Sequence, residues 1–268
     1  TLRAALIESN NRAATALQQR VGARPVLRLA SSAGLRDLPN VPSLSLGTGE
    51  VTPLDLTAAF AMFPNGGLAV RPRGITSIVD ADGGSAYENR PQTERVLSPE
   101  TAYQMVSMLE DVMNRGTASA ARQWGIRFPA GGKTGTTDDF KDAWFVGFSS
   151  SVVVAVWVGF DQPRTIAPGA YGARYALPLW SDFMRRAARR RVPQPFNAPP
   201  GLQDEQLCSV SYVRPVEGCP VYTEHFKERD DVPSRLCTVH KGTVKQRVKR
   251  AFEGLLSNIG RELKGIFR

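Results

Sequence analysis

Residues 132–137, with the sequence Gly-Lys-Thr-Gly-Thr-Thr, constrain the fold of this chain more than any other segment. They precede two runs rich in β-branched and aromatic residues, 142–149 and 152–160. Gly, Ser and Asp lie at the ends of these runs. Such runs are typical of buried or half-buried strands. The pattern therefore predicts three consecutive antiparallel strands over about 130–137, 142–149 and 152–160. The hexapeptide lies in the first of these strands.

The residue types of this hexapeptide suit a site that binds a carboxylate beside a reacting carbonyl group. Glycines on a strand edge let a ligand backbone approach closely, so a substrate peptide could lie alongside as an added strand. The hydroxyls of Thr134 and Thr136 could hold its carboxylate, with Lys133 supplying positive potential. The alternative is a Gly-rich hairpin with a solvated lysine.

A second motif, Ser9-Asn10-Asn11, ends a short predicted helix that Thr1 could cap. A Ser-x-Asn segment just past a helix can aim a hydroxyl and an amide into a cleft. Alone, this tripeptide is a common helix-end or turn sequence. It becomes informative when it is combined with the lysine motif more than a hundred residues later.

Together these motifs resemble the transpeptidase domain of class A (bifunctional) penicillin-binding proteins, in which Lys-Thr-Gly is a signature. The resemblance covers roughly residues 1–195. Further segments that are similar to the family are 45–55, 58–60, 65–67, 114–118 and 176–184. The resemblance implies an α+β fold of the penicillin-binding/serine β-lactamase-like transpeptidase type. This fold has an antiparallel sheet flanked by helices, here without its N-terminal part and with a C-terminal appendage.

The resemblance also implies a function, peptidoglycan cross-linking by a D-Ala-D-Ala transpeptidase that binds penicillin and belongs to a bifunctional glycosyltransferase/transpeptidase. In that reaction Ser9 would relay protons, Asn11 would hold the acyl-chain amide and Lys133 would act electrostatically. The backbone N–H of Thr136 would contribute to the oxyanion hole. Substrate-binding residues would be Thr134, Gly135, Thr136 and Thr137. No cofactor and no metal is expected in this site.

One departure from the family pattern concerns the nucleophile, the serine of a Ser-x-x-Lys motif that precedes the Ser-x-Asn loop. No serine lies three residues before a lysine anywhere in the chain, and the nearest imitation is 238–241, Thr-Val-His-Lys. We therefore expect a C-terminal fragment that lacks the nucleophile, its general-base lysine and the first strands, and that is inactive alone.

Two other functions would use the same motifs. A D-Ala-D-Ala carboxypeptidase or β-lactamase would pass the acyl group to water, and a non-catalytic β-lactam sensor or scaffold would keep the pocket but bind partners. Retention of Ser9, Asn11, Lys133 and Thr136 together argues against a decayed site. A Ser-His-Asp triad near Lys133 is disfavoured, because both histidines lie in the tail. Nearby carboxylates, expected to shape a turn and pair with Lys141, are Asp138, Asp139 and Asp142.

Capping residues predict the principal helices. Ser98, followed by proline and glutamate, predicts a helix from 98 to about 114, and Thr52 predicts another over 50–63. Residues 1–38 read as helical, 72–97 as a hairpin-like insertion and about 177–191 as a closing helix.

Three parts are expected, namely a partial transpeptidase domain at 1–195, a Pro/Cys-containing segment at 196–240 and a basic amphipathic helix at 241–268. The last carries eight Lys/Arg and two Glu, much of the chain's net charge of +9, so it could lie on an anionic membrane or pack on its own domain. By resemblance the parent is extracytoplasmic, on the periplasmic face of the inner membrane, with an N-terminal transmembrane anchor. Stem peptides and β-lactams are the expected partners, and nucleic acid is not.

All three cysteines lie in the tail: Cys208, Cys219 and Cys237. With His240 they could form a three-cysteine, one-histidine metal site, although the first two spacings are loose for a zinc finger. An extracytoplasmic location, which the family implies, favours a disulfide instead. We therefore expect a Cys208–Cys219 disulfide, with Cys237 unassigned.

Overall fold

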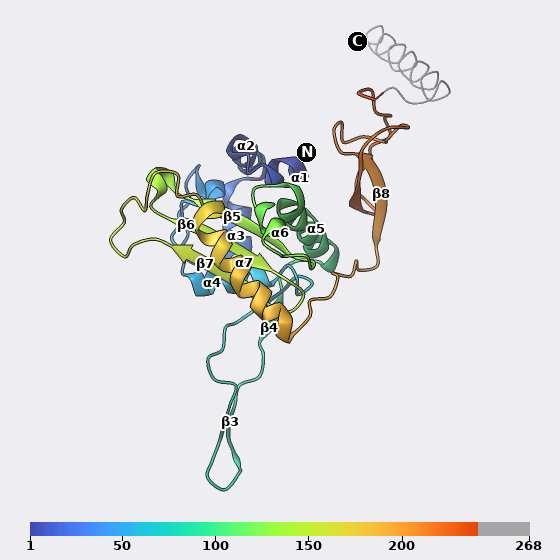
Figure 1. Ribbon diagram of the computed structural model, residues 1–268. Coiled ribbons are helices and arrows are strands. Elements are labelled where there is room, and N and C mark those ends of the chain that lie inside the picture. Colours follow the sequence, from blue (N-terminus) through green and yellow to red (C-terminus); the bar gives the residue numbers. More distant parts are fainter. Residues whose placement is uncertain (241–268) are drawn as a thin grey trace. The chain divides into compact units, whose positions relative to one another are not determined.

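A computed structural model describes residues 1–240 of the chain (Figure 1). Its contacts divide the chain into two compact units, which meet between residues 199 and 200 of the sequence. The predicted amphipathic helix at 241–268 lies outside the described residues. Among residues 1–240, no helix combines the length and the apolar character that a membrane crossing requires.

The centre of the first unit is a three-stranded antiparallel sheet in the order β5-β6-β7. Its strands are β5 Gly131–Thr136, β6 Ala143–Phe148 and β7 Val153–Val158. Lys133 lies opposite Val146 in the pairing of β5 with β6. The three antiparallel strands predicted from the sequence are confirmed. Within the described residues β5 pairs with β6 alone, so its other edge is open to a ligand strand.

Helices surround this sheet and complete the unit. They are α1 Leu2–Ile7, α2 Asn11–Val21, α3 Ala23–Ser32, α4 Pro53–Ala61, α5 Pro99–Arg115, α6 Ala120–Gln123 and α7 Gly172–Arg190, with 3-10 turns η1 Leu44–Leu46 and η2 Asp138–Phe140. The predicted caps of α4 and α5 are confirmed. Thr52 accepts a hydrogen bond from the Asp55 N–H, Ser98 accepts one from the Thr101 N–H, and proline follows each cap.

Two helix predictions need correction. Residues 1–38, which read as helical, form three helices. The first ends at Ile7, so the short helix predicted before Ser9 is confirmed. The break at Gly22 was not predicted, and there a positive φ angle of 85° excludes a right-handed helix. The closing helix was predicted from 177, next to Pro178, but it begins at Gly172 and contains that proline. Its first residue is tied to β5, since the Gly172 N–H donates to the Thr136 hydroxyl at 3.0 Å.

The core lies between the sheet, α5 and α7. Trp180 and Phe145 meet edge to face with ring centroids 5.0 Å apart, and the indole N–H of Trp180 donates to the Gly147 carbonyl oxygen. A side chain at Gly147 would lie 2.8 Å from the Trp180 ring, so only glycine fits there. Other fully buried members of this cluster include Val112, Met113, Ile126, Ala176 and Leu177.

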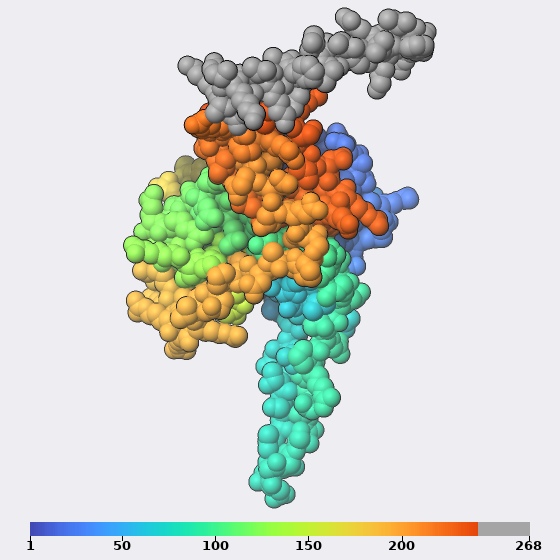
Figure 2. Space-filling view, turned by 90° about the vertical axis from the view of Figure 1, so that its right-hand side faces the viewer, coloured from blue at the N-terminus to red at the C-terminus, as the bar shows by residue number. Residues whose placement is uncertain are grey.

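A hairpin insertion extends from the first unit as a narrow projection (Figures 1 and 2). At its base β1 Leu68–Val70 pairs with β4 Thr93–Arg95. At its tip β2 Ser77–Val79 pairs with β3 Ser85–Glu88, and every residue of these two strands is exposed. The hairpin-like insertion predicted over 72–97 is confirmed.

In the second unit, residues 200–240 form an antiparallel hairpin of β8 Leu202–Cys208 and β9 Val221–Lys227, with Cys208 opposite Val221. None of the three cysteines, all of which lie within the described residues, forms a disulfide. The expected Cys208–Cys219 disulfide is therefore wrong. The loops bring all three thiols together around one histidine instead of pairing two of them.

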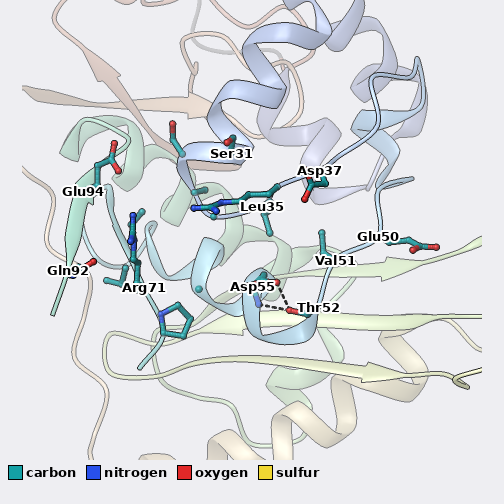
Figure 3. A pocket seen from close by; sticks show the side chains of 18 of the residues that line it. Ser31, Leu35, Asp37, Glu50, Val51, Thr52, Asp55, Arg71, Gln92 and Glu94 are labelled. Carbon is teal, nitrogen blue, oxygen red and sulfur yellow. Dashed lines mark hydrogen bonds between the residues drawn. The ribbon is translucent and has the colours of Figure 1, made fainter. Parts of the chain in front are cut away.

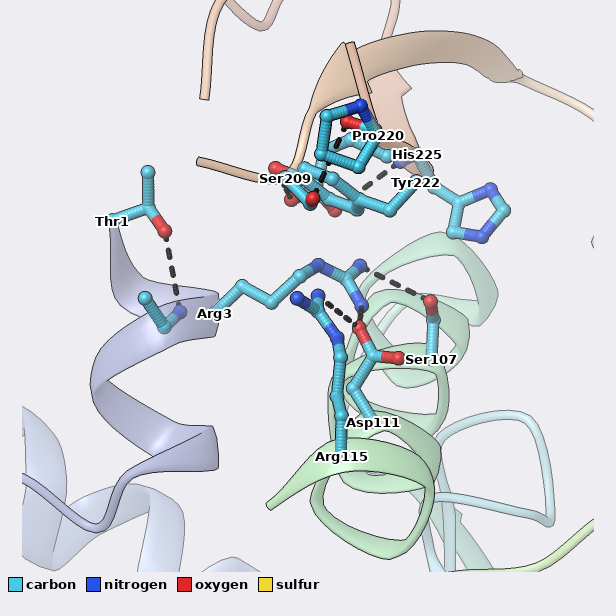
Figure 4. Close-up of polar contacts among 11 residues, drawn as sticks. Thr1, Arg3, Ser107, Asp111, Arg115, Ser209, Pro220, Tyr222 and His225 are labelled. Atoms are coloured by element: carbon cyan, nitrogen blue, oxygen red, sulfur yellow. Dashed lines mark hydrogen bonds and ion pairs between the residues drawn. The ribbon is translucent and has the colours of Figure 1, made fainter. Parts of the chain in front are cut away.

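A buried ion pair joins α1 to α5 (Figure 4). The guanidinium of Arg3, which is 2% exposed, donates to Asp111 at 2.8 Å and to the Ser107 hydroxyl at 3.1 Å. Arg115, one turn further along α5, donates to the same Asp111 oxygen. This network fixes α1, and with it the Ser9 turn that follows, on the surface of α5.

We expect Arg3→Ala to lower the free energy of unfolding of the first unit by about 3 kcal/mol, because it removes one partner of a buried pair. Arg90→Ala is the control. It breaks the Arg90–Glu88 pair, whose side chains are 82% and 59% exposed, and should change stability by less than about 0.5 kcal/mol. Urea unfolding followed by tryptophan fluorescence measures both, since all four tryptophans lie before residue 199. Equal effects of the two substitutions would contradict the role of Arg3.

Candidate active site

Lys133 and Ser9, 124 positions apart in sequence, meet beside β5. The Lys133 Nζ donates to the Ser9 Oγ at 2.8 Å and to the Thr134 carbonyl oxygen at 3.0 Å. The two motifs that the sequence analysis combined are therefore one site in space. The contact places a cation and a hydroxyl side by side next to the open edge of the sheet.

The turn between α1 and α2 presents Ser9. Ser9 takes a left-handed backbone conformation, with φ of 55°, which is costly for a residue with a side chain and is characteristic of functional positions. Asn10 caps α2 by accepting from the Ala13 N–H at 3.0 Å, a role the sequence analysis did not assign. Asn11 is then the first residue of α2 and is exposed.

The Thr134 hydroxyl lies 3.0 Å from the hydroxyl of Thr117. Thr117 follows α5, and its N–H donates to the carbonyl oxygen of Ile7 at 3.4 Å, so α1, this turn and β5 meet here. Sequence reasoning did not assign Thr117 to the site. The signal was present, because Thr117 belongs to the family-like segment 114–118.

The Thr136 hydroxyl accepts a hydrogen bond from the Gly172 N–H at the start of α7, at 3.0 Å. Its acceptor role is thus occupied, while its own proton remains available to a ligand oxygen. A side chain at Gly172 would lie 2.5 Å from the Gly135 carbonyl oxygen. Glycine at position 172 therefore allows α7 to approach β5 at the site.

Thr137 has a different environment. Its hydroxyl donates to an Asp142 carboxylate oxygen at 3.1 Å and accepts from the Asp142 N–H at 2.8 Å. The other Asp142 oxygen accepts from the Trp157 indole at 2.7 Å. The structural role expected for Asp142 is confirmed, but its partners are Thr137 and Trp157. Lys141 pairs with Asp139 instead, at 3.6 Å.

Burial lowers the pKa of Lys133 from its ordinary value of 10.5 to about 8. The cause is desolvation, which disfavours the charged ammonium. In the neighbouring α5, burial raises the pKa of Glu110 to about 7 against the opposing charge of Arg122. Near neutral pH Lys133 is thus still mainly protonated, but it can release its proton more easily than a solvated lysine.

A cavity of about 1290 Å³ lies elsewhere in the first unit (Figure 3). Polar and charged residues around it include Asp37, Glu50, Asp55, Arg71 and Glu94. At its edge Thr52 and Asp55 hydrogen-bond each other as the cap of α4. Neither Ser9 nor Lys133 lines this cavity, so it is separate from the site at β5.

Within residues 1–240, one group of side chains has the composition of a metal site, and it belongs to the second unit. Its members are Cys208, Cys219, Cys237 and His240, whose ligand atoms all lie within 4.8 Å of one another. The residues around Lys133 contribute hydroxyls and an ammonium, which are suited to a carboxylate ligand.

Comparisons with known proteins give one consistent family. A family model described as the penicillin-binding protein transpeptidase domain matches residues 1–185. The chain is 46% identical over 201 residues to penicillin-binding protein 1A of Aquifex aeolicus, covering 75% of this chain and 27% of that protein. It is 33% identical to penicillin-binding protein 1A of Pseudomonas aeruginosa, covering 87% of this chain and 35% of that protein. The chain thus spans about a quarter to a third of these relatives.

Solved structures give the same result. Penicillin-binding protein 1A from Haemophilus influenzae superposes with a TM-score of 0.80 and 25% identity, covering 88% of this chain and 41% of that one. PonA1 from Mycobacterium tuberculosis, solved in complex with penicillin V, has a TM-score of 0.64 and 23% identity, over 74% of this chain and 58% of that one. The second likeness concerns the fold alone.

We expect the Lys133 ammonium to titrate near pH 8, since burial disfavours its charged form. The folded chain then binds fewer protons than the unfolded chain between about pH 8 and 10.4, so the free energy of unfolding rises with pH across that window. The rise should reach about 3 kcal/mol and disappear in Lys133→Met. NMR titration of lysines labelled with ¹³C at Cε measures the pKa, and Lys133→Met assigns the signal. A midpoint at the ordinary value would show that Lys133 is solvated.

Proposed function

The chain belongs to the penicillin-binding protein transpeptidase family, and on that premise we propose that it supplies the carboxylate-binding half of a D-Ala-D-Ala transpeptidase site for peptidoglycan cross-linking. The observation that carries the proposal is the 2.8 Å contact between Lys133 and Ser9 beside the open edge of β5. A peptide that ends in a carboxylate can add to that edge as a strand, with its terminus against the site hydroxyls.

The proposed reaction proceeds through an acyl-enzyme. A serine attacks the penultimate carbonyl of the stem peptide, D-Ala leaves, and an amine takes the acyl group. Since the chain contains no Ser-x-x-Lys, the attacking serine comes from outside these 268 residues, in a longer protein of the kind its relatives represent. The segment alone is then inactive, and the reaction needs no cofactor.

Lys133 and Ser9 form a proton-relay pair in this proposal. A protonated lysine is donor-only, so its hydrogen bond to the Ser9 oxygen turns the Ser9 proton away from Lys133. That proton can pass to the nitrogen of the departing D-Ala, and Ser9 regains the proton that the attacking serine releases. When the amine takes the acyl group, its proton passes through Ser9 to the oxygen of that serine, so Lys133 ends the cycle in the protonation state in which it began. The lowered pKa of Lys133, about 8, suits a group that shares a proton near neutral pH.

The carboxylate of the substrate would lie against Thr134 and Thr136. Because Thr136 accepts from the Gly172 N–H, its own proton can be donated to the carboxylate. Thr134 can donate likewise when Thr117 donates to it across their 3.0 Å contact. The Thr136 N–H would complete the oxyanion hole, and Asn11 would hold the acyl-chain amide. Gly135 would allow close approach of the substrate backbone.

Thr137 does not enter this mechanism, although it was expected to bind substrate. Its hydroxyl both donates to and accepts from Asp142, and that pairing closes the turn after β5. We assign Thr137 to holding the turn rather than to the substrate.

The setting of the longer protein follows from the same premise. We place it on the periplasmic face of the inner membrane, with an anchor and a glycosyltransferase domain outside this chain, where stem peptides are its substrates and β-lactams its inhibitors. Contact of 242–268 with the membrane surface is part of the proposal, and it rests on the basic amphipathic sequence alone.

The proposal is tested by labelling with fluorescent penicillin, applied to the 268-residue chain and to the full-length protein that contains it. We expect labelling of the full-length protein only. In that protein Lys133→Ala should slow acylation by about 10² to 10³-fold, the loss typical of removing one electrostatic group from an active site. Lys141→Ala is the matched control, since Lys141 pairs with Asp139 at the surface, and it should label at the wild-type rate.

Each other outcome has a definite meaning. Labelling of the isolated chain would place the nucleophile within it and overturn the assignment. Labelling of neither form would favour a non-catalytic relative. Release of D-Ala from a stem peptide without cross-linked product, even when acceptor is present, would favour a carboxypeptidase.

A second pair of variants separates binding from turn formation. Thr136→Val should lower the rate of penicillin acylation of the full-length protein by about 10 to 100-fold, and Thr136→Ser, which keeps the hydroxyl, should restore it. Thr137→Val should leave the rate within about threefold and lower the free energy of unfolding by about 1 kcal/mol. Stopped-flow acylation and urea unfolding measure the two effects. A larger loss of rate for Thr137→Val than for Thr136→Val would reverse the assignment.

A further inference from the structure

Four side chains of the second unit converge from three separate stretches of chain. Cys208 ends β8, Cys219 lies in the loop before β9, and Cys237 and His240 follow β9 as a Cys-x-x-His pair. Cys208 and Cys237 are fully buried, and Cys219 is half-buried. We propose that these four residues bind one zinc ion through three thiolates and the Nδ1 atom of His240.

The distances between the ligand atoms fit a tetrahedral site. His240 Nδ1 lies 3.6 Å from Cys208 Sγ, 3.3 Å from Cys219 Sγ and 3.3 Å from Cys237 Sγ. The sulfurs of Cys208 and Cys237 are 3.8 Å apart. Zinc bonds of about 2.3 Å to sulfur and 2.0 Å to nitrogen, at tetrahedral angles, require S–S and S–N separations of about 3.8 and 3.5 Å.

A disulfide does not fit this arrangement. A disulfide needs two sulfurs about 2.05 Å apart, which is little more than half of the 3.8 Å between Cys208 and Cys237. It would also leave the third thiol of the cluster outside the bond. The histidine contacts every one of the three sulfurs through the same ring nitrogen, as a shared central ion requires.

Backbone hydrogen bonds hold the ligands in place. The Val216 N–H donates to the sulfur of Cys219 at 3.2 Å, and the Cys219 N–H donates to the Val216 carbonyl oxygen at 3.0 Å. The Cys237 N–H donates to the Arg214 carbonyl oxygen at 2.8 Å. An N–H aimed at a ligand sulfur stabilises its thiolate form, and such contacts around the ligands orient a metal site.

Among the described residues of the second unit, two of the ligands, Cys208 and Cys237, are buried members of its hydrophobic cluster. The buried members of its hydrophobic cluster are Cys208, Val216 and Cys237, and packed against them are Val213, Cys219 and Leu236. A unit of fewer than about 70 residues rarely folds on so small an apolar core without a metal or disulfides. Thiolates select soft or borderline metals, and a closed set of three thiolates and one imidazole is typical of structural zinc.

The first experiment measures zinc and free thiols in the full 268-residue chain, purified without chelators. We expect about one zinc per chain, bound at high affinity, and three thiols that react once the metal is removed. Cys237→Ser should lose at least about 80% of the metal. His225→Gln is the matched control, because it removes the only other histidine of the chain, which pairs with Asp204 at 2.7 Å. It should retain zinc.

A second variant separates loss of a ligand from loss of fold. His240→Ala should bind zinc weakly, whereas His240→Cys completes a four-cysteine set and should restore one equivalent. Cobalt in place of zinc should give the strong visible bands of a tetrahedral site in the wild type and in His240→Cys. A zinc-free chain with two of its thiols joined in a disulfide would overturn the proposal, and so would zinc that remains in Cys237→Ser.

Discussion

The contact between Trp180 and the backbone of β6 is central to the packing of α7 on the sheet. The indole occupies the space that a side chain at Gly147 would fill, and its N–H donates to the carbonyl oxygen of the same residue. Phe145 meets the indole edge to face. This contact sets the depth at which the helix lies on the sheet. It therefore sets where the first turn of α7 reaches β5, at Gly172 and Thr136.

The other half of the site depends on a second, independent contact. Arg3 fixes α1 to Asp111 of α5, and the carbonyl of Ile7 accepts from Thr117 in the turn that follows α5. Ser9 is carried on that framework. Lys133 of β5 joins the two halves through its hydrogen bond to Ser9. Burial of the Lys133 ammonium at this contact lowers the pKa of Lys133. Hydrogen bonds to the Ser9 hydroxyl and the Thr134 carbonyl partly offset the lost hydration of the ammonium.

Features of the fold that depend on neighbouring residues could be predicted from the sequence. Strands β5, β6 and β7 and the caps Thr52 and Ser98 were predictable because β-branched and aromatic runs, turn residues and capping hydroxyls act within a few residues. The meeting of Ser9 with Lys133 was expected only through resemblance to a family, since no local rule joins positions 124 apart. The end of the first helix before Ser9 was predicted, but the break at Gly22 between α2 and α3 was not.

Other features depend on which side chains meet in space, and spacing alone does not encode that. Thr136 and Thr137 are adjacent and chemically identical, yet Thr136 lies against α7 and Thr137 against Asp142. Thr117 joins the site through the turn after α5. The cysteines show the same limit. A preference for oxidised pairs in an extracytoplasmic setting favoured a disulfide, whereas the loops after β8 and β9 bring three sulfurs to one imidazole.

Metal binding and disulfide formation compete for the same sulfurs in the second unit. A thiolate bound to zinc is a poor partner for exchange, because the metal occupies the electron pair that would attack a disulfide. Oxidation of Cys208 with Cys237 would shorten their 3.8 Å separation and leave two ligands of four, too few to hold zinc. Whichever forms first, the zinc-bound site or the disulfide, therefore prevents formation of the other. In an oxidising compartment the proposed site persists only if the metal is bound before the thiols meet an oxidant, so loading must accompany folding of the unit.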